Sequence, residues 1–296
     1  MLLLWGSMAL AVDEVEFAAA DTTLTESVAP VTTLSAELGG AFASGNSVYQ
    51  TLNSALTGSQ RWSANRISLD GSTNVTSSVI DSDGDGILNE TERAVGLAES
   101  ARRYEGELRY DRYLGDKQSL YALLGGFVDP FAGYDRRTHE QLGYSRIFVD
   151  DNATHLVGEL GADVAQENYV EGIEPNTSTV YAGRAMVGVV HQLNESVTVS
   201  EKAETYVNIL DADDFRVLNE LAISSQISSA LSLKLSQALT YDNVPVTGYR
   251  PMDMTTMVTL VATLLDTSGD GSSSGLIDDL VDGLASNGRD RSDEEG

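Results

Sequence analysis

Strand-length segments of alternating polarity follow one another from residue 34 to residue 265, and the connections between them are alternately short and long. One segment shows the alternation plainly: over residues 103–111 the charged side chains share one face, and Tyr, Gly, Leu and Tyr share the other. No apolar run is long enough for a spanning helix, and a closed antiparallel sheet is the other structure that pairs every backbone amide within a membrane. The sequence therefore predicts an all-β protein, an up-and-down antiparallel transmembrane β-barrel.

About twelve strands are expected. They cover residues 34–44, 48–62, 66–76, 102–114, 119–128, 138–149, 155–166, 180–193, 197–209, 216–228, 231–241 and 255–265. The connections after even-numbered strands are tight, and those after odd-numbered strands are longer, apart from the short first hairpin at residues 44–46. Outer-membrane barrels place short turns in the periplasm and long loops outside, so both ends of the barrel strand series are expected in the periplasm.

Composition narrows the class of protein further. The chain has 296 residues with no internal boundary in the strand-rich part, which favours one domain. A net charge of −27 argues against nucleic acid and against an anionic bilayer surface as partners, and suits a saline or cation-rich medium. Because the chain has no cysteine, disulfides and a lipid-bearing lipoprotein Cys are excluded.

The regions outside the strands are interpreted from their composition. Residues 1–11 are typical of a short signal peptide that lacks a positive n-region and ends at an Ala-x-Ala site, which predicts export. Residues 12–32 are expected to be a flexible periplasmic lead-in, residues 33–265 the barrel, and residues 266–296 an acidic, disordered tail. The predicted location is the outer membrane of a Gram-negative bacterium.

Charged residues that alternate with apolar neighbours are expected to line the interior of the barrel. They are Glu105, Glu107, Arg109, Glu159, Asp163, Lys202, Glu204, Glu220 and Lys234. A barrel of this size is often filled by its own side chains. Aromatic residues are expected at the two membrane interfaces, with Trp62, Tyr113 and Phe148 on the periplasmic side and Tyr49, Tyr134, Tyr169 and Tyr241 on the outer side. The alternative for the charges is the solvated face of a soluble β-sandwich.

Several segments resemble a bacterial outer-membrane family of unknown function, DUF481, whose members are often called salt-induced outer-membrane proteins. The similar segments are 34–46, 103–113, 120–123, 131–137, 142–144 and 231–236, and the distinctive pieces are an SGN hairpin, an RYDRYL run and an FAGYDRRT loop. The resemblance implies an outer-membrane barrel, a link to salt or envelope stress, and no catalytic residues. It also implies outer-membrane lipids, lipopolysaccharide and the barrel assembly machinery as partners.

An insertion at residues 77–100, between the third and fourth strands, contains the sharpest motif. Its residues 81–92 match the EF-hand calcium loop at every ligand position. The predicted calcium ligands are Asp81, Asp83, Asp85, the Ile87 carbonyl, Asn89 and Glu92. Gly86 would permit the sharp turn, a short exit helix is expected over residues 92–99, and the entering helix of an EF-hand is missing. We therefore expect a structural Ca²⁺ on the outer side of the membrane, with weak affinity of about 10⁻⁴–10⁻³ M.

The first interpretation is a non-enzymatic outer-membrane barrel that acts in envelope integrity or in small-solute or ion passage under salt or osmotic stress. An alternative is a barrel enzyme acting on membrane lipids, in which Ser145 and His155 would face each other across a hairpin. A third is a secreted calcium-binding β-sandwich adhesin. A second acidic cluster at residues 266–271 has Ile277 where the bidentate acid should be, and is interpreted as a linker.

Overall fold

The computed structural model describes residues 30–45, 47–84 and 87–267. These residues form twelve strands, a short helix α2 (Glu90–Val95) and a 3₁₀ helix η1 (Pro130–Ala132). The strands are β1 (Val31–Ala43), β2 (Tyr49–Trp62), β3 (Asn65–Ser78), β4 (Ala98–Gly115), β5 (Gln118–Asp129), β6 (Tyr134–Asp150), β7 (Thr154–Tyr169), β8 (Thr177–Asn194), β9 (Val197–Asn208), β10 (Phe215–Gln226), β11 (Leu231–Asp242) and β12 (Met252–Asp266). In the described part of the chain, no helix is both long and apolar enough to cross a membrane.

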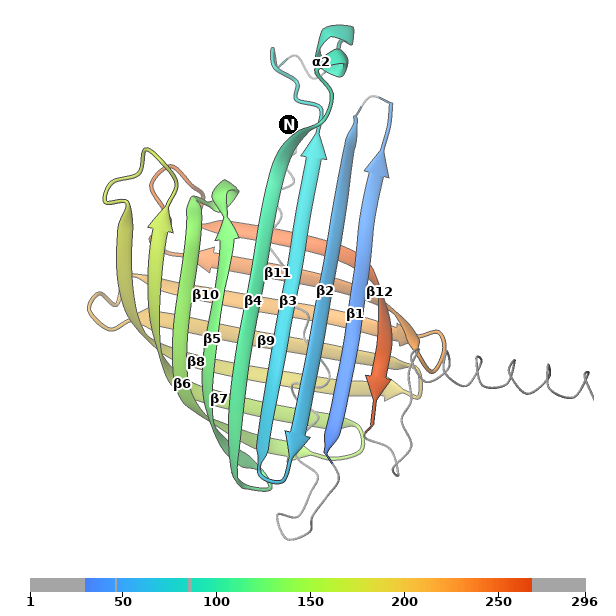
Figure 1. Ribbon diagram of the computed structural model, residues 1–296, viewed down its shortest axis with the longest axis vertical. Coiled ribbons are helices and arrows are strands. Elements are labelled where there is room, and N and C mark those ends of the chain that lie inside the picture. Colours follow the sequence, from blue (N-terminus) through green and yellow to red (C-terminus); the bar gives the residue numbers. More distant parts are fainter. Residues whose placement is uncertain (1–29, 46, 85–86, 268–296) are drawn as a thin grey trace, which may run out of the picture.

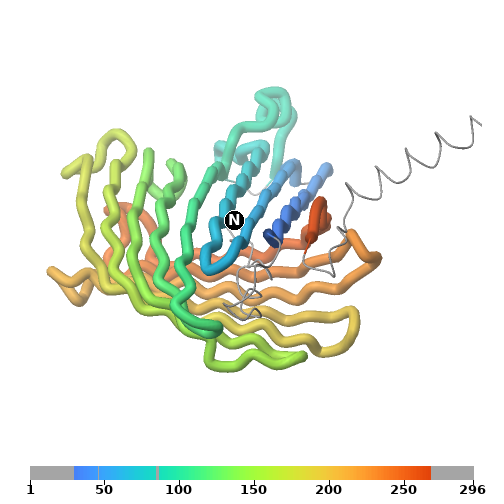
Figure 2. Tube along the Cα trace, turned by 60° about the horizontal axis from the view of Figure 1, so that its bottom comes forward, coloured from blue at the N-terminus to red at the C-terminus, as the bar shows by residue number. Residues whose placement is uncertain are grey.

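All twelve strands belong to one closed antiparallel sheet. Each strand pairs with its neighbours in sequence, and β1 closes the sheet on β12, with Leu34 opposite Leu265 and Gly39 opposite Thr259. Figure 1 shows β1 to β4 crossing in front of the strands of the far wall, and Figure 2 shows the wall curving continuously round to β12 beside β1. The predicted twelve-stranded up-and-down barrel is confirmed. The β-sandwich alternative is wrong, because one closed sheet leaves no second sheet to pack against.

The wall of the barrel is polar inside and apolar outside. On β4, Arg109 and Asp111 are buried in the interior, whereas Tyr104, Leu108 and Tyr110 are between 41% and 48% exposed on the outer face. The same alternation recurs around the barrel, and most buried side chains are polar or charged. A water-soluble protein has the reverse distribution, so this wall is suited to a surrounding of lipid.

The connections at the two ends of the barrel differ in length. One end, the short-turn end, has the connections 63–64, 116–117, 151–153, 195–196 and 227–230. The other, the long-loop end, has the connections 44–48, 79–97, 130–133, 170–176, 209–214 and 243–251. In Figure 1, α2 rises from the long-loop end beyond the strands. The predicted alternation of short turns and long loops is confirmed for most connections, but the connection 227–230 at the short-turn end is as long as the connection 130–133 at the long-loop end.

Several strands are longer than predicted, chiefly at the long-loop end. β4 begins at Ala98 rather than at residue 102, β6 begins at Tyr134 rather than at residue 138, and β1 includes two residues of the predicted lead-in. The predicted alternation of polarity is weak in these extensions, yet their backbone pairing continues, as between Ser77 and Glu99. The predicted signal peptide and nearly all of the predicted tail lie outside the described residues.

Candidate functional site in the barrel interior

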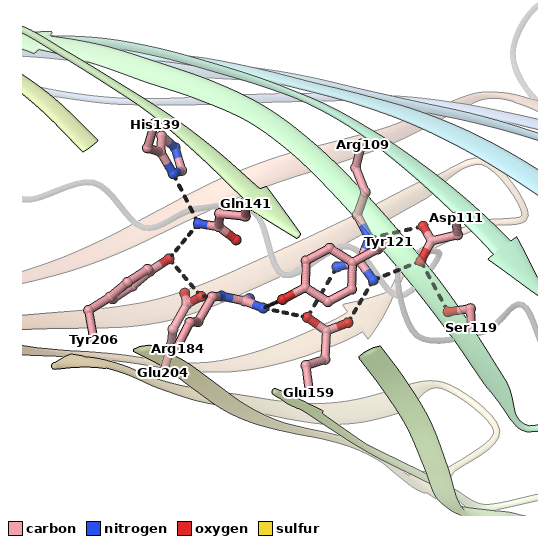
Figure 3. Close-up of polar contacts among 10 residues, drawn as sticks. All are labelled: Arg109, Asp111, Ser119, Tyr121, His139, Gln141, Glu159, Arg184, Glu204 and Tyr206. Atoms are coloured by element: carbon pink, nitrogen blue, oxygen red, sulfur yellow. Dashed lines mark hydrogen bonds and ion pairs between the residues drawn. The ribbon is translucent and has the colours of Figure 1, made fainter. Parts of the chain in front are cut away.

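Five buried charged side chains form a layer across the interior from β4 to β9. This ion-pair layer consists of Arg109, Asp111, Glu159, Arg184 and Glu204, each at most 6% exposed. Arg109 donates to both oxygens of Asp111 at 2.9 Å and to Glu159 at 2.6 and 3.2 Å. Arg184 donates to Glu159 at 2.7 Å and also to Glu204. Glu159 of β7 therefore joins Arg184 of the neighbouring strand β8 to Arg109 of β4, as the contacts in Figure 3 show.

The strand register places these groups at inward positions, where a lone charge would be costly. Arg184 of β8 lies opposite Gly161 of β7, one inward position along the strand from Glu159. Taking a single charge out of water costs several kcal/mol, and the cost is offset only by close pairing and hydrogen bonds. Because each arginine of the layer contacts two carboxylates, the layer stabilises the filled interior as a unit.

Tyr121 of β5 packs against both arginines of the layer. Its hydroxyl accepts a hydrogen bond from Arg184 at 2.6 Å, and the Arg109 guanidinium lies 4.3 Å from the centre of its ring. The ring fits because Gly143 and Gly161 lie opposite each other on β6 and β7. A Cβ atom at Gly161 would lie 2.6 Å from the Tyr121 hydroxyl, and one at Gly143 would be closer still. The two glycines are therefore required for this close approach.

A second set of polar contacts lies beside the layer, toward the long-loop end. The Gln141 Nε2 atom donates to the Tyr206 hydroxyl at 3.0 Å and lies 2.9 Å from His139 Nδ1. The Tyr206 hydroxyl donates in turn to Glu204 at 2.8 Å. Gln141 is 3% exposed, and its Oε1 atom has no hydrogen-bond partner among the residues that the structure describes. This acceptor is notable because buried polar atoms are normally paired.

Cavities lie on the two sides of the ion-pair layer. The outer cavity, toward the long-loop end, has a volume of about 140 Å³ and is bordered by Arg184 and Glu204. The inner cavity, toward the short-turn end, has a volume of about 30 Å³ and is bordered by Arg109, Asp111 and Glu159. The layer therefore separates the two cavities.

The part of the interior beside β1, β11 and β12 is also filled. Lys234 of β11 donates to Glu37 of β1 at 3.0 Å, and the Thr259 hydroxyl of β12 donates to the same carboxylate at 3.2 Å. Lys234 and Thr259 are each 4% exposed. The contacts link the strands on both sides of the seam at which the sheet closes.

Further ion pairs lie at the mouth of the long-loop end. Arg216 of β10 donates to Glu167 of β7 at 2.7 Å and to Asp242 at 2.9 Å, and Arg137 donates to Glu167 at 3.1 Å. Since β7 and β10 are not neighbours in the sheet, the contact between Arg216 and Glu167 crosses the interior rather than running along the wall.

The loop of residues 243–251, named here the mouth loop, extends over the outer cavity. The Tyr249 hydroxyl donates to the Pro130 carbonyl at 3.4 Å. Gly133 has a φ of 91°, and a Cβ atom there would lie 2.8 Å from the Tyr249 ring and 2.9 Å from Val246. The β5–β6 and β11–β12 connections are half a turn apart in the strand order. The mouth loop therefore crosses the mouth and packs against its far side.

The predicted calcium loop lies at the same end, in the connection that contains α2. Carboxylate oxygens of Asp81, Asp83 and Glu92 lie within 4.8 Å of one another. The Glu92 Oε1 atom accepts from the Ser82 backbone at 2.7 Å, and its Oε2 atom accepts from the Asn89 backbone at 3.0 Å. These two backbone N–H groups, first that of Asn89, lower the pKa of the Glu92 carboxyl below its ordinary value. The cluster can supply ionised oxygen ligands to a hard cation.

The rest of the motif agrees with the sequence in part. Asn89 caps α2, with its side chain accepting from the Glu92 N–H at 3.0 Å, and Ile87 is described with an exposed side chain. Asp85 and Gly86 lie outside the described residues. The segment before the loop is strand β3, as expected, and the exit helix ends at Val95, earlier than predicted, because Gly96 takes a positive φ of 85°.

All nine charged residues predicted to face the interior do so. Glu105, Glu107 and Lys202 border the outer cavity, and the remaining six are buried. The residues predicted to line the interior did not include Asp111, Tyr121, Glu167, Arg184, Tyr206 and Arg216, although the alternation over residues 103–111 already puts Asp111 on the face of Arg109. A period-two signal was available for two of these, since Asp111 follows Arg109 by two residues and Tyr206 follows Glu204 by two.

The structure does not bring Ser145 and His155 face to face. Ser145 lies opposite Glu159 in the β6–β7 pair, and His155 lies opposite Asp150. The His155 Nδ1 atom is 3.0 Å from Asp150, and no hydrogen bond joins His155 to Ser145. The two residues are therefore separated along the strands and are not hydrogen-bonded to each other, although both border the inner cavity.

At least three of the predicted interface aromatics face inward instead, because Tyr169 lies opposite Tyr134 and its hydroxyl donates to the buried Glu167. Tyr134 is buried and packs edge-on against Phe127 with ring centres 5.4 Å apart, and Tyr113 borders the inner cavity. Trp62 and Phe148 are exposed on the outer face as predicted. These tyrosines were misplaced because they lie near strand ends, where loop position alone does not fix the face.

Comparisons with known proteins give one family match. A family model described as "Protein of unknown function, DUF481" matches residues 36–264. No curated protein matches the chain.

Several solved structures resemble the chain at low identity. They include the NanC porin (11% identity, 79% of this chain and 98% of that chain, TM-score 0.46). The translocator domain of the autotransporter NalP from Neisseria meningitidis matches at 12% identity over 84% and 93% of the two chains, with a TM-score of 0.42. An anion-selective porin from Comamonas acidovorans matches at 11% identity over 79% and 100%, with a TM-score of 0.35. The barrel assignment rests on the strand pairing of this chain and not on these likenesses.

Proposed function

The chain belongs to the family described as "Protein of unknown function, DUF481", and from that premise we propose that it is a non-enzymatic barrel of the Gram-negative outer membrane that restricts the passage of small polar solutes or ions. Its wall would contact outer-membrane lipid and lipopolysaccharide after insertion by the barrel assembly machinery. The long-loop end would face outward, and the short-turn end would face the periplasm.

The observation that supports this proposal most is the ion-pair layer inside an apolar wall. The outer face offers leucine and tyrosine side chains to lipid, and the interior offers buried charges that a lipid-facing surface would exclude. A polar interior allows polar solutes to enter a barrel that is surrounded by lipid. The layer would limit such entry, because a solute must displace paired side chains to pass.

We also propose that this passage, or the integrity of the envelope, matters under salt or osmotic stress. The acidic composition of the chain supports this role, because small cations screen self-repulsion among its carboxylates at high ionic strength.

The membrane assignment is tested by extraction. The chain starting at residue 12, expressed with an export signal, should stay with the membrane fraction in high salt and enter solution only with detergent. When refolded with phospholipid vesicles, it should float with them in a density gradient. Recovery as a monodisperse protein without detergent would contradict the proposal, because the apolar outer face would then have to tolerate water.

We propose that the loop of residues 81–92 binds a structural Ca²⁺ through Asp81, Asp83, Asp85, the Ile87 carbonyl, Asn89 and Glu92. At 10 mM Ca²⁺, the weak affinity of extracellular loops corresponds to about 2 kcal/mol of stabilisation, or a rise in melting temperature of roughly 3–8 °C. The wild type should show this rise, and Asp81→Ala/Glu92→Ala should not.

A matched control is Asp211→Ala/Asp213→Ala, which removes two exposed carboxylates from the β9–β10 loop. This control should respond to Ca²⁺ like the wild type. Equal shifts in all three proteins would indicate nonspecific screening and would reject the calcium loop.

A further inference from the structure

We propose that the outer cavity binds a small, neutral, polyhydroxylated solute of about the size of a monosaccharide. This inference deepens the proposed function by naming a solute class for the long-loop end. It rests on that function only for its physiological meaning, because binding in the cavity does not require transport.

The position of the outer cavity is that of a binding site at the mouth of the barrel. The ion-pair layer limits it on the inner side, and the mouth loop crosses it on the other. Arg250 at the edge of the cavity is exposed to solvent. A volume of about 140 Å³ is several times the roughly 30 Å³ that one water molecule occupies in the liquid, so the cavity has room for a small organic molecule.

The charges around the cavity favour a ligand without net charge. Six carboxylates, six arginine or lysine side chains and one histidine, His139, line it, and His139 lies 3.5 Å from Glu107 and 3.3 Å from Asp163. Arg103 is paired with Glu105 at 3.0 Å and Arg216 with Asp242 at 2.9 Å, while Arg184 belongs to the ion-pair layer. A charged ligand would have to displace one partner of such a pair and leave the other uncompensated.

Hydroxyl groups can use the hydrogen-bonding capacity that these ion pairs leave open. A guanidinium has five N–H donors and a carboxylate has about four acceptor positions, so each pair can bind hydroxyls without separating. Gln141 gives an independent indication of a donor ligand. Its buried side chain lines the cavity, and its Oε1 atom, which is itself inaccessible to solvent, has no partner among the described residues, so a ligand O–H would pair with it once the amide group turns toward the cavity.

The remaining part of the cavity lining is apolar. Leu123, Leu218 and Val246 contribute aliphatic surface, and Phe127 and Tyr134 contribute aromatic rings. A sugar ring has an apolar C–H face and a polar rim of hydroxyls, which fits a site with both kinds of surface.

The test is isothermal titration calorimetry of the full chain in detergent, with D-glucose and myo-inositol as probes. D-Glucuronate, which carries a carboxylate on the sugar ring, and zwitterionic glycine betaine are titrated in the same way as charged comparison ligands. We expect saturable binding of the neutral probes, and at least about tenfold weaker binding of glucuronate and betaine. Failure of both neutral probes to bind, or equal or tighter binding of glucuronate or betaine, would overturn the proposal.

Gln141→Met removes the unpartnered acceptor with little change in volume and should weaken glucose binding about tenfold. Gln118→Met, at the short-turn end, is the matched control and should bind glucose like the wild type. If Gln141→Met does not fold, Leu218→Trp fills the cavity from β10 and should abolish binding. Undiminished binding in a folded Gln141→Met or Leu218→Trp variant would also reject the site. Conductance measurements test the proposed function separately. Absence of sugar binding would therefore not reject the proposed function, and absence of conductance would not reject the binding site.

Discussion

Replacing all five residues of the ion-pair layer by serine should raise the single-channel conductance in planar bilayers by about tenfold or more. The substitutions Arg109→Ser, Asp111→Ser, Glu159→Ser, Arg184→Ser and Glu204→Ser remove every charge of the layer together, so that no member is left unpaired. The outer and inner cavities, which the layer separates, would then join. Twelve strands lie between the small barrels that side chains fill and the large barrels that leave an aqueous channel, so this interior should hold water once the layer is removed.

The matched control replaces exposed charges at the short-turn end. Its substitutions are Asp116→Ser, Lys117→Ser and Glu195→Ser. This variant should conduct like the wild type, because its charges do not border either cavity. A wild-type conductance as high as that of the serine variant would show that the layer does not close the interior. A folded serine variant without added conductance would show that the interior is closed elsewhere, for example at Lys234 and Glu37.

The sequence predicted the wall of the barrel better than its interior. Alternation of polarity is a local property, and it identified all twelve strands and the inward direction of residues such as Arg109 and Glu159. The contact between Arg109 and Glu159 joins strands that are not neighbours, so it depends on barrel curvature and stagger, which no local pattern encodes. Arg184 was missed because it stands alone between Gly183 and Ala185 and has no charged residue two positions away.

The mouth of the barrel was predicted least well, for a physical reason. Strands above the membrane contact water or other loops, so the alternation that identifies a strand weakens there. Tyr134 was therefore assigned to an outer loop, although it begins β6 and is buried. The calcium motif can be recognised without any knowledge of the barrel, because its ligand positions are fixed within one loop, and calcium binding there stays a prediction. The structure brings together Asp81, Asp83 and Glu92 as the motif predicts.

Removing only Glu159 should lower the free energy of unfolding more than removing the whole layer does. In Glu159→Ala, Arg109 and Arg184 lose the carboxylate that they share, at 2.6 and 2.7 Å, and face each other in a buried space. Each arginine keeps a second carboxylate, Asp111 or Glu204, so we expect a loss of about 3 kcal/mol, at the lower end of the range for a broken buried pair. The five-serine variant should lose less stability than this single variant, because it leaves no charge of the layer unpaired.

Equilibrium unfolding in guanidinium chloride, with the barrel in phospholipid vesicles, measures the free energy of unfolding of these variants. Glu195→Ala is the control for Glu159→Ala, since it removes an exposed carboxylate from the β8–β9 turn and should change the free energy by at most about 0.5 kcal/mol. If Glu159→Ala is no less stable than Glu195→Ala, the two arginines must already be solvated. Water would then reach the layer in the native barrel, and the conductance of the wild type should be correspondingly high. The unfolding and conductance measurements thus test the same packing independently. A tightly packed layer predicts that Glu159→Ala lowers the free energy of unfolding and that the wild type conducts poorly.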